Sequence, residues 1–297
     1  MNQVVGKSLM LAINFVGCGN LGKTLGRLIT VHHLGKVEGV VTTSLKSADK
    51  AVEFIGAGKS CTNYSELPTA DIYFITTGDD LIETVCNQLI AEAKVAKGAI
   101  IIHCSGSLSS DVLMQARDAG CYAFSVHPVK SFANPELSVE QFSGTYCGYE
   151  GDEAVFPTLN ALFTGMGAIL FPITKEQKPI YHAAGVIANN YIVGLHYLAS
   201  ECYRFAGVDE NIAYQMTSML MSEAIQNLQK FNHKNALTGP LQRGDIEVVR
   251  EHLSHLTALP QIKAVYASLG EAIIPISDRA KQLKDKFVAL FQEQSKE

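Results

Sequence analysis

Residues 11–22 read LAINFVGCGNLG, an apolar run that leads directly into a glycine-rich turn. The apolar part has the length and composition of a buried strand, and helical spacing follows the turn. In this G-x-G-x-x-G pattern Gly17 permits the tight turn, Gly19 lets the backbone approach a ligand, and Gly22 allows a helix to pack closely on the strand. The N–H groups at the start of that helix attract phosphate. We therefore expect a dinucleotide to be bound by Gly17, Cys18, Gly19, Asn20, Leu21 and Gly22.

Short apolar runs recur after this turn, and amphipathic segments separate them; the runs cover residues 37–43, 71–78, 98–106 and 121–128. Near-continuous apolar strands that alternate with helices are typical of a parallel sheet covered on both faces. Residues 131–173 continue less regularly, with a strand and turn, a helix near 154–167 and a last strand at 168–173. The sequence thus predicts an α/β Rossmann domain with a mostly parallel sheet over residues 9–173.

The pattern becomes helical from Thr174 onward. Apolar residues recur every three or four positions in 179–206, 209–231 and 260–295. Lys178-Pro179 indicates a helix start, because proline lacks only an N–H that would be unpaired in the first turn. We therefore expect an all-α domain over residues 174–297.

The composition is that of an ordinary globular protein, with 297 residues, 47% hydrophobic and 18% charged. A net charge of −5 gives no electrostatic reason to bind nucleic acid or an anionic membrane. No apolar run approaches the roughly 20 residues that span a bilayer, and we interpret the first residues as a tail and a strand rather than a signal peptide. The seven cysteines lack C-x-x-C spacing, which favours reduced thiols in the cytoplasm and no metal site.

The tip of the second strand bears on which dinucleotide is bound. Sites for NAD place a carboxylate there for the ribose 2′-hydroxyl, whereas this chain has TTSLK at 42–46. Glu38 lies near the beginning of the strand and should point elsewhere. Hydroxyl groups and a lysine can hold a 2′-phosphate that a carboxylate would repel. We therefore expect NADP rather than NAD, with Thr43, Ser44 and Lys46 at the 2′-phosphate.

Polar side chains end three further strands of the expected sheet, where ligands of such sheets lie. Thr76 and Thr77 end one strand, Ser105 follows the next, and His127 lies in a His-Pro step at the end of the third. Threonine and serine at such ends can also simply cap the next helix. Histidine is suited to proton transfer because its ordinary pKa lies near neutrality. We therefore expect Thr76 and Thr77 near the cofactor, His127 as an acid or base, and Ser105 to orient the substrate.

The helical half carries its own candidates. His182 and Asn189 are seven residues apart, two turns along one helix face, and Asn190 follows directly. Polar groups on a buried helix need partners or solvent, so they either bond across a domain interface or face the cleft. In the second case His182 is an alternative acid or base, Asn190 assists catalysis and Asn189 contacts the substrate. Arg243, in a polar loop at 237–245, would either pair with Asp245 or anchor an anionic substrate.

These motifs resemble those of one known family. The segments GCGNLG, ADIYFITTGDD, HCSGSL, SVHPVKSF, YHAAGVIANN and LTGPLQRGD occur in the order found in Rossmann-like proteins with a helical C-terminal domain of unknown function. That family is similar to deazaflavin-dependent NADP oxidoreductases and, more widely, to 6-phosphogluconate and β-hydroxyacid dehydrogenases. The resemblance covers nearly the whole chain. It implies NAD(P) binding, a C-terminal domain like that of 6-phosphogluconate dehydrogenase, and a homodimer built on the helical domains.

The chain departs from the β-hydroxyacid dehydrogenases at one position. Those enzymes carry a catalytic lysine four residues before an asparagine on the first long helix. Here Gly185 and Val186 stand four residues before the two asparagines, so His182 or Lys178 would have to replace the lysine. Prephenate dehydrogenases, in contrast, have an active-site histidine in a His-Pro step and a serine at the preceding strand end, as at His127 and Ser105.

Three functions are consistent with these residues. The first is an NADP-dependent oxidoreductase that transfers hydride to or from a C=O or C=N carbon of a small molecule. The second is a sensor or regulatory protein that binds NADP without catalysis, which the missing lysine favours. The third is an enzyme like prephenate dehydrogenase. Metal-dependent hydrolysis by His103, His127 and His182 is disfavoured, because no carboxylate-rich ligand spacing accompanies them.

Overall fold

The computed structural model describes residues 10–293 and divides the chain into two compact units, Met1–Asn189 and Asn190–Glu297. The expected tail, the domain limit at residue 9 and the last residues of the helical pattern at 260–295 lie outside the described residues. The sequence pattern changes to helical at residue 174, and the first helix after that position belongs to the first unit.

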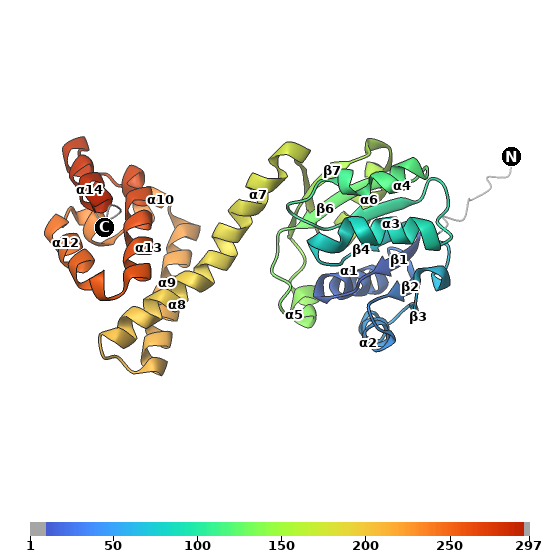
Figure 1. Cartoon of the computed structure of the whole chain (residues 1–297), viewed down its shortest axis with the longest axis horizontal. Coiled ribbons are helices and arrows are strands. Elements are labelled where there is room, and N and C mark those ends of the chain that lie inside the picture. Colours follow the sequence, from blue (N-terminus) through green and yellow to red (C-terminus); the bar gives the residue numbers. More distant parts are fainter. Residues whose placement is uncertain (1–9, 294–297) are drawn as a thin grey trace. The chain divides into compact units, whose positions relative to one another are not determined.

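An eight-stranded sheet forms the centre of the first unit (Figure 1). The strand order is β3-β2-β1-β4-β5-β6-β7-β8, and every neighbouring pair is parallel except β6 and β7. The sheet is therefore mostly parallel, as the apolar runs predict. The strands are β1 Ala12–Val16, β2 Lys36–Val41, β3 Lys59–Cys61, β4 Ile72–Ile75, β5 Ile100–His103, β6 Tyr122–Pro128, β7 Tyr146–Gly151 and β8 Ile169–Pro172.

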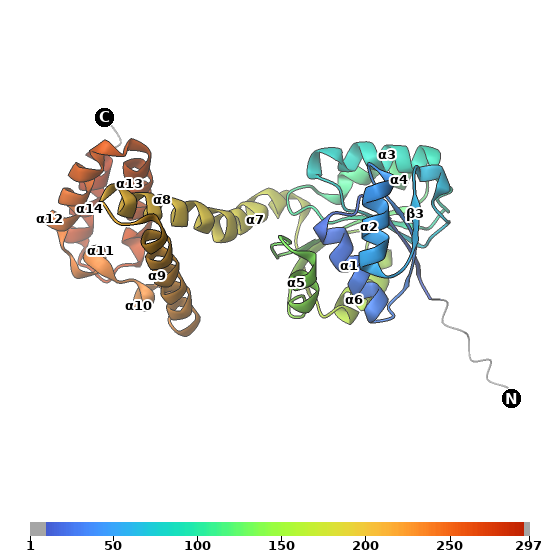
Figure 2. The ribbon, with the colours of Figure 1, turned by 90° about the horizontal axis from the view of Figure 1, so that it is seen from below.

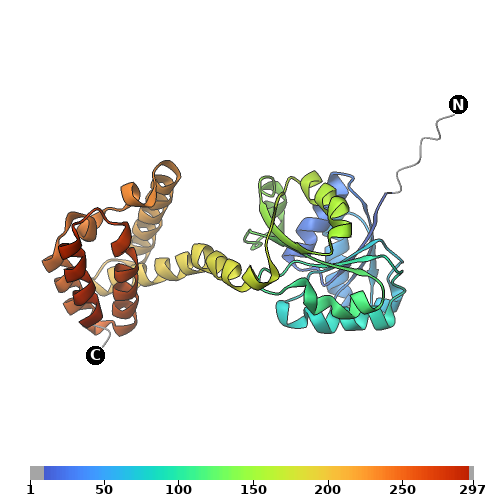
Figure 3. The same ribbon diagram turned by 90° about the horizontal axis from the view of Figure 1, so that it is seen from above.

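Helices cover both faces of this sheet. Figure 2 shows α3 and α4 on one side and α1, α5 and α6 on the other, and Figure 3 shows the same layers from the opposite direction. Successive side chains of a strand point to opposite faces, so two separate apolar cores result. The helices are α1 Asn20–Val31, α2 Leu45–Ile55, α3 Ile82–Glu92, α4 Met114–Asp118, α5 Pro135–Glu140, α6 Phe156–Gly165 and α7 Lys178–Gly185.

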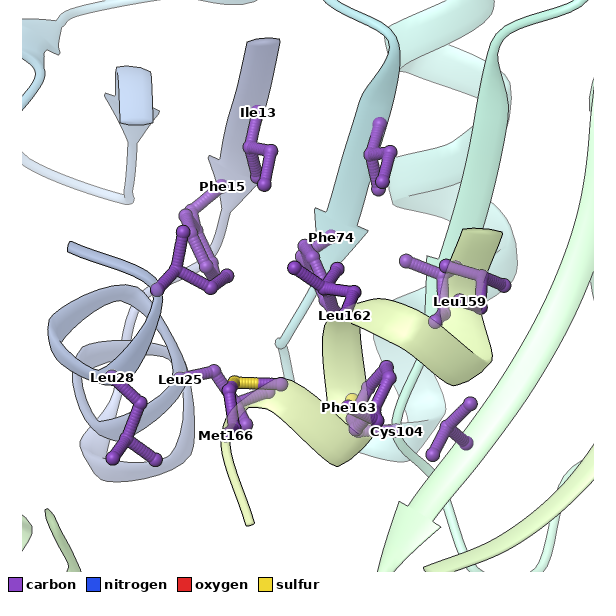
Figure 4. Packing of buried hydrophobic residues seen from close by; sticks show 14 of the residues in the cluster. Ile13, Phe15, Leu25, Leu28, Phe74, Cys104, Leu159, Leu162, Phe163 and Met166 are labelled. Carbon is purple, nitrogen blue, oxygen red and sulfur yellow. The ribbon is translucent and has the colours of Figure 1, made fainter. Parts of the chain in front are cut away.

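The core beneath α1 and α6 is rich in aromatic side chains (Figure 4). Phe15 of β1 stacks on Phe74 of β4 with ring centroids 5.0 Å apart, and Phe163 of α6 packs against Phe74. Leu25 and Leu28 reach the same core from α1. This packing fixes the start of α1, and with it the glycine loop, at the carboxyl end of β1.

The second unit is helical. It contains α8 Tyr191–Phe205, α9 Glu210–Lys230, α10 His233–Ala236, α11 Gly239–Arg243, α12 Ile246–His255, α13 Pro260–Ile273 and α14 Lys281–Glu293. Its core lies among α11 to α14 and includes Val249, Leu253, Phe287 and Phe291. The segment expected as a loop at 237–245 therefore contains a short helix, which ends at Gly244 with φ +88°. Over residues 10–293, no helix is both long and apolar enough to cross a bilayer.

A π-helical segment, Val186–Asn190, separates α7 from α8. The expectation that His182 and Asn189 lie two turns apart on one face assumes 3.6 residues per turn. The wider π turn does not keep that spacing. Asn189 and Asn190 are both exposed, whereas His182 is partly buried. The prediction that His182 and Asn189 lie on one helix face is therefore wrong.

Candidate active site

The turn of the glycine loop requires glycine at its first position. Gly17 has φ +70°, and its N–H donates to the carbonyl of Val41 at 2.8 Å. A Cβ on Gly17 would lie 2.4 Å from Cγ2 of Thr77. A Cβ on Gly22 would lie 2.5 Å from Oγ1 of Thr76, whose hydroxyl donates to the Gly17 carbonyl. The two threonines at the end of β4 thus hold the loop against the sheet.

Gly19 leaves the start of α1 open. A Cβ on Gly19 would meet nothing within 4 Å, and no side chain caps the helix. The first N–H groups of a helix are unpaired within it, so they remain available to phosphate oxygens. These residues therefore fit the pyrophosphate of a dinucleotide.

The other residues of the loop have structural partners. The Asn20 amide donates to the carbonyls of Phe132 and Ala133 at 2.8 and 3.1 Å, which ties α1 to the segment after β6. Cys18 is buried, and burial raises the pKa of its thiol to about 12. Leu21 packs against the core. Their predicted contacts with a dinucleotide stay predictions.

At the tip of β2, Ser44 caps α2 by accepting a hydrogen bond from the Ser47 N–H at 3.2 Å. The Thr43 and Lys46 side chains are exposed, and neither pairs with another residue in the part of the chain that the structure describes. Glu38 pairs with Lys36 at 2.7 Å, away from the tip, as expected. The tip thus offers a hydroxyl, an ammonium group and a helix start, and no carboxylate.

The carboxyl ends of β1, β4, β5 and β6 lie along one edge of the sheet, because these strands are parallel neighbours. Strands are about 4.8 Å apart, so the end of β6 lies roughly 14 Å along this edge from the glycine loop. His127 is the penultimate residue of β6. The loop and His127 therefore flank the ends of β4 and β5.

His127, Tyr181 and His182 form a cluster at this edge. Nδ1 of His127 lies 2.8 Å from the Tyr181 hydroxyl oxygen, and the His127 and His182 rings meet edge to face at 5.8 Å. Gly106 packs directly against both histidines, since a Cβ there would lie 2.8 Å from Nε2 of His127 and 2.5 Å from Cδ2 of His182. Gly148 lies opposite His127 in β7. Because it has no side chain, the Tyr181 ring can pack against it; a Cβ there would lie 3.0 Å from the Tyr181 hydroxyl oxygen.

The His127 imidazole of this cluster carries no charge at physiological pH. Burial, the Lys178 ammonium and His182 lower the pKa of His127 to about 4, so its imidazole is neutral at physiological pH. Burial raises the pKa of Tyr181 to about 12, so its hydroxyl keeps its proton. The ordinary histidine pKa on which the sequence argument relied therefore does not apply to His127, because its side chain is buried and near the Lys178 ammonium. Its role as an acid or base stays a prediction.

Ser105 belongs to a hydrogen-bonded turn after β5. Its hydroxyl donates to Asp79 Oδ2 at 2.7 Å and accepts from the N–H groups of Ser107 and Leu108 at 3.2 and 3.0 Å. These contacts hold the turn that carries Gly106. His103 is fully buried between the Ser105 N–H and the Ser109 carbonyl, and burial lowers its pKa to about 4.

The remaining predicted residues make no contact with this cluster that the structure records. Thr77, beside the glycine loop, is partly buried, and its Oγ1 has no hydrogen-bond partner among the described residues. Asn190 and Arg243 are in the second unit, and Arg243 pairs with Asp245 at 2.7 Å, which is the first of its two expected roles. Substrate contacts by Asn189, Asn190 and Arg243 stay predictions.

The sequence pattern did not indicate Tyr181 or Glu150 as site residues, and it suggested Lys178 only as a substitute acid or base. Lys178 is instead fully buried. One signal was present: Lys178, Tyr181 and His182 have the i, i+3, i+4 spacing that places side chains on one helix face.

Comparison with known proteins supports the two-part architecture. Residues 4–128 match the model of a Rossmann-like domain, and residues 145–273 match a domain of unknown function, DUF2520. The chain thus matches a Rossmann-like domain followed by DUF2520, in the order that the resemblance implies. The DUF2520 match begins at β7, so it includes the last two strands of the sheet and α7. No curated protein matches the chain.

Three solved structures match over nearly the full length of both chains. A candidate NADP oxidoreductase from Bacteroides fragilis is 20% identical, with a TM-score of 0.73 over 90% of this chain and 98% of its own. Protein TM1727 from Thermotoga maritima is 28% identical, with 0.65 over 96% and 98%. The Plasmodium falciparum pyrroline carboxylate reductase, solved with NADP bound, is 14% identical, with 0.57 over 95% and 98%. These similarities confirm the fold class.

Proposed function

We propose that the protein is an NADP-dependent oxidoreductase acting on a small molecule with a C=O or C=N bond. The observation that carries this proposal is the placement of the His127–Tyr181 pair on the same sheet edge as the open glycine loop. A dinucleotide held at the loop would extend along the ends of β4 and β5 toward that pair. Solved structures of similar fold, among them an imine reductase from Myxococcus stipitatus in complex with NADP+, are in keeping with this reading.

The glycine loop and the tip of β2 would hold the cofactor. The Gly19 backbone and the start of α1 would bind its pyrophosphate, and Thr43, Lys46 and the N–H groups at the start of α2 would bind the 2′-phosphate. Lysine provides a point charge for phosphate. When bound, NADPH supplies a hydride to the substrate carbon.

His127 and Tyr181 would handle the accompanying proton. Because Tyr181 keeps its hydroxyl proton, it can donate to Nδ1 of His127, and Nε2 then carries the ring proton. A neutral imidazole N–H can polarise a carbonyl or imine without an added charge. As the substrate heteroatom takes the Nε2 proton, the Tyr181 hydroxyl would pass its proton to Nδ1, and the tyrosinate so formed would recover a proton from solvent before the next turnover. His182, whose ring packs edge to face with that of His127, would contact the substrate or the pair.

The test is a titration of the protein with NADPH and NADH, followed by nicotinamide absorbance with a panel of small ketones, oxo acids and cyclic imines. Oxidation of NADPH by wild type, lost in His127→Gln, is expected. NADPH binding without oxidation by any member of the panel would favour the sensor, and absence of NADPH binding would refute both. A role like that of prephenate dehydrogenase receives less support, because the Ser105 hydroxyl is already occupied by Asp79 and two backbone N–H groups.

We further propose that the protein is a homodimer through α8 and α9. These helices pack on each other but expose many large apolar side chains, among them Tyr191, Val193, Tyr197, Phe205, Tyr214 and Met219, each at least 55% exposed. They also line an open groove of about 900 Å³. Proteins that stay monomeric rarely expose so much apolar surface, and a second copy would cover it.

A further inference from the structure

Lys178, the first residue of α7, is a fully buried lysine. Its Nζ donates to the Ser105 carbonyl at 3.0 Å and to the Ser125 hydroxyl at 2.6 Å, and lies 3.8 Å from Oε1 of Glu150. These partners come from the end of β5, from β6 and from β7. Burying a lysine charge is unfavourable unless it is paired and hydrogen-bonded, and here it is both.

The partner carboxylate is equally well held. Glu150 is 7% exposed, and its two oxygens accept from the N–H and the hydroxyl of Ser110, each at 2.7 Å. The register of the sheet places Glu150 directly opposite Ser125. Lys178 thus attaches the start of α7 to the sheet by two hydrogen bonds, to the turn after β5 and to β6, and by an ion pair with Glu150 of β7.

The same helix carries two of the three residues of the cluster. Tyr181 and His182 follow Lys178 by three and four residues, so the three side chains lie on one face of α7. We propose that Lys178 is the positioning residue of this site: its buried ammonium fixes α7 on the sheet so that the Tyr181 hydroxyl meets Nδ1 of His127. The catalytic importance of this positioning rests on the proposed function, whereas the placement of Tyr181 against His127 can be tested without any activity.

The charges around His127 agree with this role. Burial lowers the pKa of His127 most, Lys178 and His182 lower it further, and Asp79 raises it, while Tyr181 is uncharged below its raised pKa of about 12. Removing the Lys178 charge should therefore raise the pKa of His127. A lysine that only fills space would have no such effect.

The experiment compares Lys178→Met with Lys175→Met, a matched control. Lys175 loses the same charge three residues earlier, but its partner is Asp111 and its side chain is 36% exposed. Long-range ¹H–¹⁵N spectra of the imidazoles, titrated from neutral to acid pH, report the tautomer and pKa of His127. NADPH binding is followed in parallel, because Lys178 does not touch the glycine loop.

In Lys178→Met we expect the His127 titration to move toward higher pH and its Nδ1 shift to change, with NADPH affinity within twofold of wild type. Lys175→Met should leave the His127 titration unchanged. If Lys178→Met does not fold, because Glu150 is left unpaired, the double variant Lys178→Met/Glu150→Gln removes both charges and should give the same shift. An unchanged His127 titration and tautomer in the folded variant would overturn the proposal, whether or not an oxidoreductase activity is found.

Discussion

The Tyr181 hydroxyl lies 2.8 Å from Nδ1 of His127, although 54 residues separate the two in the chain. One side chain belongs to the last turns of the first unit and the other to a central strand of its sheet. In the proposed mechanism, this contact makes the histidine at a strand end part of a two-residue path for a proton.

Tyr181→Phe tests that path. Loss of one hydrogen bond should cost about 1 kcal/mol of folding free energy, while a lost contribution to proton transfer should lower kcat by about 10²-fold. Urea unfolding and steady-state kinetics measure the two effects. Tyr146→Phe, at a 59% exposed tyrosine in β7, is the control and should change neither. Equal kcat for Tyr181→Phe and wild type would remove Tyr181 from the mechanism.

Gly19→Ala separates ligand binding from folding. No neighbour lies within 4 Å of the added Cβ, so unfolding should be nearly unchanged, while NADPH affinity should fall by about tenfold or more because the methyl group occupies the approach to the phosphates. Gly17→Ala should instead destabilise the fold by about 2 kcal/mol, since φ is +70° and Thr77 blocks the Cβ. Fluorescence titration and thermal unfolding distinguish the two. Unaltered NADPH affinity in Gly19→Ala would place the cofactor elsewhere.

Lys46→Ala addresses cofactor choice. If Lys46 binds the 2′-phosphate, its loss should weaken NADPH binding by about tenfold, or about 1.4 kcal/mol, and leave NADH binding unchanged. Lys50→Ala, one turn later on α2, removes the same charge away from the strand tip and serves as the control. A parallel loss of affinity for both dinucleotides would argue against recognition of the 2′-phosphate.

Acid should destabilise the first unit through His103. Its pKa is about 4 in the folded protein and near 6.5 when unfolded, so the unfolded state binds more protons between these values. The contribution of His103 to the free energy of unfolding is therefore complete above about pH 6.5. It falls as the pH drops toward 4, by up to about 3 kcal/mol. Urea midpoints across this range give the slope. His103→Gln lacks the titrating group, and a slope as steep as that of wild type would assign the effect to other residues.

Association through α8 and α9 can be tested with Val193→Glu. Val193 is 69% exposed in a single chain, and a carboxylate buried at a subunit interface is strongly unfavourable. Sedimentation equilibrium should show wild type as a dimer and the variant shifted to monomer. Met114→Glu, at an apolar residue 49% exposed in the first unit, should stay dimeric. A monomeric wild type would contradict the proposal.

Much of the first unit was predictable from local pattern alone. The run at 11–22 indicates a strand, a tight turn and a helix, and all three occur in β1, the glycine loop and α1. Later apolar runs coincide with β2, β4, β5 and β6, whereas the three-residue β3 carries too short a signal. The π-helical segment at 186–190 was not visible, because apolar spacing does not distinguish a π turn from an α turn over five residues.

The sequence by itself thus determined most strands and long helices and the open glycine loop, since hydrophobic period and glycine geometry are properties of neighbouring residues. Only the tertiary structure decided the chemistry at the sheet edge. It buried Lys178 against Glu150, engaged Ser105 with Asp79 and brought Tyr181 to His127. Those partners depend on which strands and helices meet, and burial with a nearby cation, rather than residue type, makes His127 neutral.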